Sequence, residues 1–215
     1  MMKKLGLSMA AALAVTSSVS LAQVPSYVEV SPDLGIAAQL YVPGVGDYDL
    51  FDMGVGAEIQ FRDWINYPWG YLLSIGYGEW STDADAEKPG SNLYDFTGDM
   101  EVTPFGGSVL FQVFNEDSMS LTLEAGVRYM AVDSKVKARN STFATTDRTD
   151  IDIDDGIVGR IGATFEYASS EDFLWTLGLA YQEDIQRGDV TFDGGSAVDN
   201  IMEAFVVEAA MRMPF

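Results

Sequence analysis

The stretch from Phe205 to Phe215 constrains the fold more than any other part of the chain. Apolar side chains occupy every second position of this stretch, and the charged residues Glu208 and Arg212 lie between them. Successive side chains of a β-strand point to opposite faces. The period-two pattern therefore predicts a strand with one apolar face and one charged face, and this strand ends the chain on an aromatic residue.

The same alternation recurs along the chain and predicts eight strands, over residues 34–42, 51–61, 71–80, 105–113, 121–131, 157–167, 173–181 and 205–215. We expect an aromatic-rich turn at residues 62–70, and long polar connections near residues 43–50, 81–98, 133–150 and 187–198. Long and short connections alternate after the first hairpin. The sequence therefore predicts an all-β, eight-stranded antiparallel up-and-down β-barrel.

Two kinds of barrel fit this pattern. A soluble barrel points its apolar face inward, whereas a transmembrane barrel points that face to lipid and keeps polar residues inside. From the second strand onward, the apolar face carries no charge within the apolar bands. The opposite face is rich in glycine, as a narrow lumen filled by side chains requires, and it carries Asp52, Glu58, Glu124, Arg128, Arg160, Glu166, Glu208 and Arg212. The transmembrane barrel is favoured.

Aromatic residues on the apolar face gather at both ends of the predicted strands. Phe105, Tyr129 and Phe205 belong to one set, and Trp175 and Phe215 belong to the other. Aromatic girdles of this kind mark the two boundaries of a membrane. Because outer-membrane barrels have short periplasmic turns and long extracellular loops, we expect both chain ends in the periplasm and the long connections outside.

The N-terminus has the features of a secretory signal peptide. Lys3 and Lys4 precede an apolar run from Leu5 to about Val15, and a cleavage site follows at Ala22. The alternative is a membrane-spanning helix, but this run is shorter than the roughly 20 residues that such a helix needs. We therefore expect residues 1–22 to be removed, residues 23–33 to form a periplasmic lead-in, and residues 34–215 to form the barrel.

The composition excludes several kinds of chemistry. The chain has no cysteine and no histidine, which excludes disulfides, Cys or His metal sites and a Ser-His nucleophile. The formal net charge of −21 argues against nucleic acid, because phosphate binding needs basic patches. Residues 150–155 offer carboxylates to calcium but lack the spacing and the glycine of a calcium loop, so a solvated strand entrance is favoured. No catalytic residue, cofactor or metal site is predicted.

The whole pattern resembles the small eight-stranded bacterial outer-membrane barrels of the OmpA transmembrane domain, OmpX and OmpW type. The resemblance rests on the period-two strands, the alternating connections and the terminal Phe215. It implies a monomer in the cell outer membrane, in contact with lipid and lipopolysaccharide. In that family the barrel-assembly machinery recognises the last strand, so Phe215 is the candidate assembly signal.

The inward face supplies a second candidate site. An eight-stranded barrel is just wide enough for its own side chains, so charges on this face must pair. We expect a plug of ion pairs formed by Glu58, Glu124, Arg128, Arg160, Glu166, Glu208 and Arg212, with Asp52 nearer the external mouth. The excess carboxylate would be protonated, or held by water or one of the glutamines Gln39, Gln60 and Gln112.

Three functions remain open. The leading hypothesis is a non-enzymatic envelope protein whose acidic external loops make surface interactions. The alternative is a narrow, porin-like channel for small solutes. An outer-membrane enzyme is the third and least favoured. Conductance measurements distinguish the first two, and lipid or peptide hydrolysis assays test the third.

Overall fold

The computed structural model describes residues 32–43, 53–88, 92–116, 118–140, 149–169, 173–186, 189–192, 196–199 and 203–215. All of them belong to one compact unit, residues 31–215. The predicted signal peptide, almost all of the predicted lead-in, and Asp52 lie outside the described residues. Within these ranges, no helix is long and apolar enough to cross a membrane.

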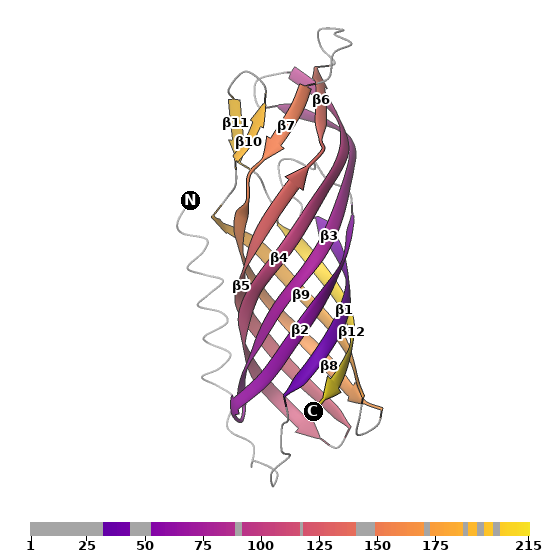
Figure 1. Ribbon diagram of the computed structural model, residues 1–215, viewed down its shortest axis with the longest axis vertical. Coiled ribbons are helices and arrows are strands. Elements are labelled where there is room, and N and C mark those ends of the chain that lie inside the picture. The colour runs from indigo at the N-terminus through magenta and orange to yellow at the C-terminus, as the bar shows by residue number, and fades with distance from the viewer. Residues whose placement is uncertain are drawn as a thin grey trace. The chain divides into compact units, whose positions relative to one another are not determined.

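Eight antiparallel strands close into an up-and-down barrel (Figure 1). Each strand pairs with the next barrel strand along the chain, and the last pairs with the first. They are β1 (Asp33–Pro43), β2 (Gly54–Asn66), β3 (Trp69–Lys88), β4 (Asn92–Glu116), β5 (Met119–Ser134), β8 (Gly156–Ala168), β9 (Leu174–Gln186) and β12 (Ala204–Pro214). The predicted fold class is confirmed.

Strand β12 closes the barrel against β1 along its whole length. Asp33 lies opposite Pro214 at one end of this pair, and Pro43 lies opposite Ala204 at the other. The backbone N–H of Phe215 also donates to the carbonyl oxygen of Pro32 at 3.0 Å. A closed sheet leaves no edge whose backbone polar groups would face lipid without partners. The C-terminal strand therefore completes the hydrogen bonding of the whole barrel.

The two ends of the barrel differ. The β2–β3 turn at Tyr67 and Pro68, the β4–β5 turn at Ser118 and the connection after β8 lie at the same end as Pro32 and Phe215. We call this the short-turn end. At the opposite end, the long-hairpin end, β3 and β4 stay paired as far as Lys88 opposite Asn92.

Four short strands extend the sheet at the long-hairpin end, at the top of Figure 1. They continue outward from β4 and are β6 (Lys137–Asn140), β7 (Thr149–Ile153), β10 (Asp189–Phe192) and β11 (Ser196–Asp199). The prediction of polar connections at 81–98, 133–150 and 187–198 is therefore wrong in part, because these stretches contain paired strands. A strand needs an outward apolar face only where it contacts lipid. The alternation of apolar residues that predicts strands therefore disappears where the sheet continues beyond the lipid.

Two predicted boundaries at the short-turn end are also wrong. Strand β2 runs on to Asn66 and β3 begins at Trp69, so the turn expected over residues 62–70 is reduced to two residues. Strand β1 begins at Asp33, which the sequence places in the lead-in. In both places the strand continues past the apolar band through a polar residue that faces the lumen, namely Arg62 or Asp33.

Apolar side chains cover the outside of the barrel. Along β1, for example, Ala37, Gln39 and Tyr41 are buried, whereas Ile36 and Leu40, at alternate positions, are exposed. The same alternation around the barrel forms the apolar belt, whose side chains are 38–62% exposed: Ile36, Leu40, Val55, Ile59, Leu73, Ile75, Val109, Val127, Ile161, Leu177, Leu179 and Val207. A soluble barrel would hide these residues, so this surface is suited to lipid.

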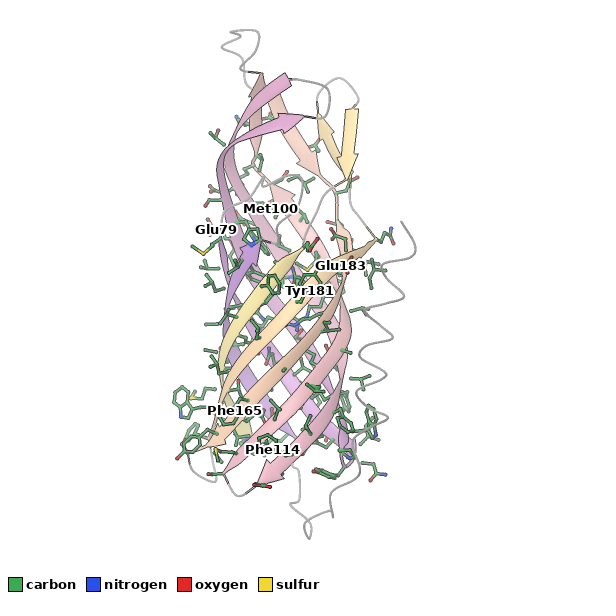
Figure 2. All side chains as sticks on the ribbon, turned by 180° about the vertical axis from the view of Figure 1, so that it is seen from behind. Glu79, Met100, Phe114, Phe165, Tyr181 and Glu183 are labelled. Carbon is green, nitrogen blue, oxygen red and sulfur yellow. The ribbon has the colours of Figure 1, made fainter. Side chains whose placement is uncertain are left out.

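Aromatic rings from neighbouring strands meet at both margins of the apolar belt. Near the long-hairpin end, the centroids of Tyr181 and Phe205 are 5.2 Å apart. Near the short-turn end, those of Trp69 and Phe111 are 4.9 Å apart. Figure 2 shows Phe165 toward the short-turn end and Tyr181 nearer the long-hairpin end. Tyr181, Phe205 and Phe111 therefore lie at the margins where the sequence predicts the two aromatic girdles, and Trp69 adds to the second.

Candidate functional site

Charged side chains fill much of the lumen. Each of them is at most 9% exposed, and the set contains four arginines and five acids: Arg62, Arg128, Arg160, Arg212, Asp33, Glu58, Glu124, Glu166 and Glu208. All seven residues that the sequence proposes for the plug are in this set, and Asp33 and Arg62 are additional. Five acids against four bases again leave one excess carboxylate.

One group, the middle cluster, joins five charged residues from four strands. Arg128 Nη1 contacts Glu58 Oε1, and Arg128 Nη2 lies 3.6 Å from Glu124 Oε1. Arg160 Nε lies 3.0 Å from the same Glu124 oxygen, and its Nη2 lies 3.1 Å from Glu208 Oε2. Each arginine therefore holds two carboxylates, and Glu124 links the two arginines.

Neutral side chains bind further carboxylate oxygens of the middle cluster. Gln39 Nε2 donates to Glu208 Oε2 at 2.8 Å, and Gln60 Nε2 donates to Glu58 Oε2 at 3.0 Å. The Ser108 hydroxyl donates to Glu124 Oε1 at 3.0 Å. Two of the three glutamines named from the sequence therefore bond carboxylates. The third, Gln112, is buried, and its Oε1 has no partner among the described residues.

A second group, the short-turn cluster, lies toward the short-turn end of the lumen. It contains Asp33, Arg62, Glu166 and Arg212. Arg62 Nε and Nη2 both lie 2.6 Å from Asp33 Oδ2, and Arg62 Nη1 contacts Glu166 Oε1. Arg212 Nη1 donates to Asp33 Oδ1 at 3.0 Å. Gln60 joins the two clusters, because its Oε1 accepts from Arg212 while its Nε2 donates to the middle cluster.

Sequence reasoning missed Asp33 and Arg62 although a signal was present. Arg62 continues the inward series of Glu58 and Gln60, each two residues after the one before. Asp33 continues the inward series of β1 in the same way. Both residues lie where the outward apolar residues give way to the short-turn end, so a search that follows the apolar face stops before reaching them.

Glycines leave room for the charged side chains. A Cβ atom on Gly76 would lie 2.6 Å from Cγ of Glu58, and one on Gly126 would lie 2.2 Å from Oγ of Ser108. These distances are too short for real atoms. The glycines of the inward face therefore make room for side chains of the neighbouring strand, Glu58 opposite Gly76 and Ser108 opposite Gly126.

An apolar cluster fills the lumen on the other side of the middle cluster, toward the long-hairpin end. It consists of Tyr41, Trp80, Met100, Val102, Met130, Val136, Ile153, Val158, Ala180, Ala204 and Val206, all buried. The ring centroids of Tyr41 and Trp80 are 4.5 Å apart. The Tyr41 hydroxyl donates to Gln39 Oε1, so Tyr41 connects the apolar cluster to the middle cluster. The charges of the inward face, from which the plug is predicted, give no indication of this apolar cluster.

A row of carboxylates lies on the outside of β3, β4 and β5 near the long-hairpin end. Glu79 lies directly opposite Glu101, which lies directly opposite Asp133 on the next strand. Lys135 Nζ contacts Glu101 Oε1 at 2.6 Å, and both groups are partly exposed. Like charges opposite one another weaken strand pairing. Three carboxylates against one lysine leave this row with a net negative charge, and Lys135 stabilises the charge of Glu101 at its centre.

Asp155 joins the β7–β8 connection to β5. One carboxylate oxygen accepts from the Tyr129 hydroxyl, and the other accepts from the backbone N–H of Val132 at 2.8 Å. These two hydrogen bonds lower the pKa of the Asp155 carboxyl from its ordinary value, and the bond from Tyr129 has the larger effect. Among the described residues, no group of three or more carboxylates is arranged to hold a metal ion.

The proposed assembly signal lies at the margin of the apolar belt. The Phe215 side chain is 72% exposed. Its ring centroid lies 6.4 Å from that of Phe61 on β2, on the far side of β1. Phe215 therefore belongs to the short-turn girdle and is accessible from outside the barrel.

Known structures share this fold. OprG from Pseudomonas aeruginosa superposes with a TM-score of 0.62 at 13% identity, over 86% of this chain and 96% of that one. A major outer membrane protein from Thermus thermophilus gives 0.52 at 13% identity, over 86% and 100%. AlkL, solved by solid-state NMR in lipid bilayers, gives 0.52 at 12% identity, over 90% and 94%. No protein-family model and no curated protein matches the sequence.

The fold and the outer surface agree with each other. The compared structures are outer membrane proteins, and the superposition covers nearly the full length of each of them. The apolar belt with its two girdles is the surface that such a protein turns to lipid. The chain therefore has the fold of the small eight-stranded outer-membrane β-barrels.

Proposed function

We propose that this protein is a non-enzymatic component of the outer membrane whose barrel is a closed anchor for an acidic extracellular surface. One observation carries the proposal: charged and apolar side chains occupy the lumen along the barrel. The short-turn cluster, the middle cluster and the apolar cluster follow one another between the two ends. A lumen filled in this way favours an anchor over an open pore.

The surface to be presented is the sheet extension at the long-hairpin end. In this proposal that end faces the outside of the cell, because outer-membrane barrels have their long loops there. The row of Glu79, Glu101 and Asp133, and exposed Glu183 on β9, give its base a negative charge. A partner that contributes positive charge would relieve the repulsion between these carboxylates.

The membrane contacts of the proposed anchor follow from its outer surface. The apolar belt would contact lipid, and the girdle at the long-hairpin end would lie at the level of lipopolysaccharide. Phe215 would serve as the signal that the barrel-assembly machinery recognises, since it is exposed and ends the strand that closes the barrel. All of these contacts can be made by a monomer.

Conductance is the measurement that tests the proposal. The full chain, purified in detergent, should give a β-rich circular dichroism spectrum and migrate differently on a gel before and after boiling. Reconstituted into planar bilayers, it should conduct little or not at all. A large and steady conductance would overturn the closed anchor and support the alternative, a narrow channel for small solutes.

A further inference from the structure

Polar atoms without partners gather in the short-turn half of the lumen. Among the described residues, the hydroxyls of Ser74, Thr122 and Thr176 and the amide oxygen of Gln112 are buried and have no hydrogen-bond partner. Gln112 on β4 lies directly opposite Thr122 on β5. Burying a polar group without a hydrogen bond is unfavourable, so these atoms point to a ligand that can bond to them.

Most of these atoms are close to the short-turn end. Thr122 is three residues from the start of β5, and Thr176 is two residues from the start of β9. At about 3.3 Å per residue, these side chains lie about 7–10 Å from the strand ends. A small ligand that entered from this end would meet them first.

Several arginine N–H groups of the middle and short-turn clusters also lack an acceptor. They are Nε and Nη2 of Arg128, Nε and Nη1 of Arg160, and Nε of Arg212. The unsatisfied set therefore contains donors, an acceptor and hydroxyls that can be either. An anion would satisfy only the donors, and the excess carboxylate of the lumen would oppose it. Water satisfies all of them, since a buried water makes about three hydrogen bonds to such groups.

The long-hairpin half of the lumen is different. Its inward side chains include Val102, Met130, Val158 and Val206, all at most 1% exposed, and none of them carries a hydrogen-bonding group. The Tyr41 hydroxyl, at the boundary between the halves, is bonded to Gln39. Narrow apolar segments of a pore exclude water and thereby stop ions.

We infer that water enters the lumen from the short-turn end, binds among the unpartnered hydroxyl, amide and guanidinium groups, and stops at the apolar cluster. The apolar cluster, and not the ion pairs, is then the barrier to conduction. The inference rests on the proposed function, because it assumes that the unmodified barrel conducts little.

Solid-state NMR on the unmodified protein in lipid bilayers tests the position of the water directly. Magnetisation from water should reach the methyl groups of Thr122 and Thr176 about threefold or more faster than those of Val102 and Val158, because only the threonines bond to water. Slow transfer at all four would show that the short-turn half is dry. Fast transfer at all four would show that the apolar cluster does not exclude water. Either result would overturn the inference.

Conductance of variants tests the barrier. A triple variant with Val102→Thr, Met130→Gln and Val158→Thr keeps the side-chain sizes nearly unchanged and makes the apolar segment polar. Its conductance in planar bilayers should exceed that of the unmodified protein about tenfold or more, because an apolar constriction would have been removed. The matched control, Val109→Thr with Val127→Thr, makes the same kind of change on the lipid-facing belt and should not conduct.

A variant of the middle cluster completes the comparison. Glu58→Gln with Arg128→Gln removes both charges of one ion pair and leaves side chains that can still hydrogen-bond. If this variant conducts and the triple variant does not, the ion pairs are the barrier and the inference fails. Conduction by the unmodified protein would instead refute the closed anchor. Gel mobility before boiling shows which variants are folded, and if the triple variant is not, the NMR comparison still decides.

Discussion

Replacing Arg128 by alanine is the most informative single change in the lumen. The Arg128 side chain is 2% exposed and contacts Glu58, whose side chain is fully buried. It also lies 3.6 Å from Glu124. Arg128→Ala would leave the buried carboxylate of Glu58 without its cationic partner. Removing one partner of a buried pair costs about 3–5 kcal/mol, and we expect a loss of this size in the free energy of unfolding.

The measurement is urea unfolding of the barrel in lipid vesicles, with the folded fraction read from gel mobility. A loss of about 3–5 kcal/mol corresponds to a factor of roughly 10² to 10⁴ in the folding equilibrium. The matched control is Lys135→Ala, whose ion pair with Glu101 lies at the surface with the lysine side chain 63% exposed. Exposed pairs of this kind contribute about 0.2–1 kcal/mol. If both variants lose the same small amount, the middle cluster is not a buried, mutually dependent network.

A double variant separates the charge from the packing. Glu58→Gln with Arg128→Met removes both charges and keeps most of the volume. Replacing a whole buried ion pair by neutral side chains is often close to neutral in stability. The double variant should therefore be much more stable than Arg128→Ala alone. A double variant as unstable as the single one would mean that packing, and not the unpaired Glu58 charge, explains the loss.

Two further predictions concern other parts of the chain. Deleting Phe215 should lower the amount of protein assembled in the outer membrane more than Pro214→Ala does, and equal amounts in membrane fractions would show that the terminal ring is incidental. In a carboxyl NMR titration, Asp155 should have a pKa below its ordinary value, and Tyr129→Phe should raise it, because the Tyr129 hydroxyl is its main stabilising partner. Since the folded-state pKa is lowered, the contribution of Asp155 to folding stability is fully present above its ordinary pKa and is lost as the pH falls through the folded-state pKa. An unshifted pKa would contradict the contact with Tyr129.

The barrel could be predicted from the sequence because lipid imposes a rule on every strand. Outward residues such as Ile59 and Leu177 must be apolar, and the small, polar residues between them mark the lumen. Where a strand does not face lipid its outward residues need not be apolar, and this is why the period-two pattern does not predict β6, β7, β10 and β11. Their pairing depends on contacts between segments far apart in the chain, which a period-two pattern does not contain.

The lumen was predictable in part for the same reason. Charged residues such as Arg160 and Glu208 occupy the strand positions that alternate with the apolar, lipid-facing ones. Their place in the lumen therefore follows from this alternation, here called parity, alone. Partners do not follow from parity, because they depend on which strands face each other across the barrel. The apolar residues Met130 and Val158 share the parity of the charges, and this inward apolar content is the signal that would have indicated the apolar cluster.

The paired hairpin of β3 and β4 sets how far the proposed binding surface stands from the membrane. Strand β3 continues for eight residues from Trp80, beside the lumen, to Lys88. At about 3.3 Å per residue and a tilt of about 40°, this lifts the tip of the hairpin by roughly 20 Å. Because the backbone is held in a sheet, a partner that met it there would have little chain to order on binding, and the entropic cost of association would be small.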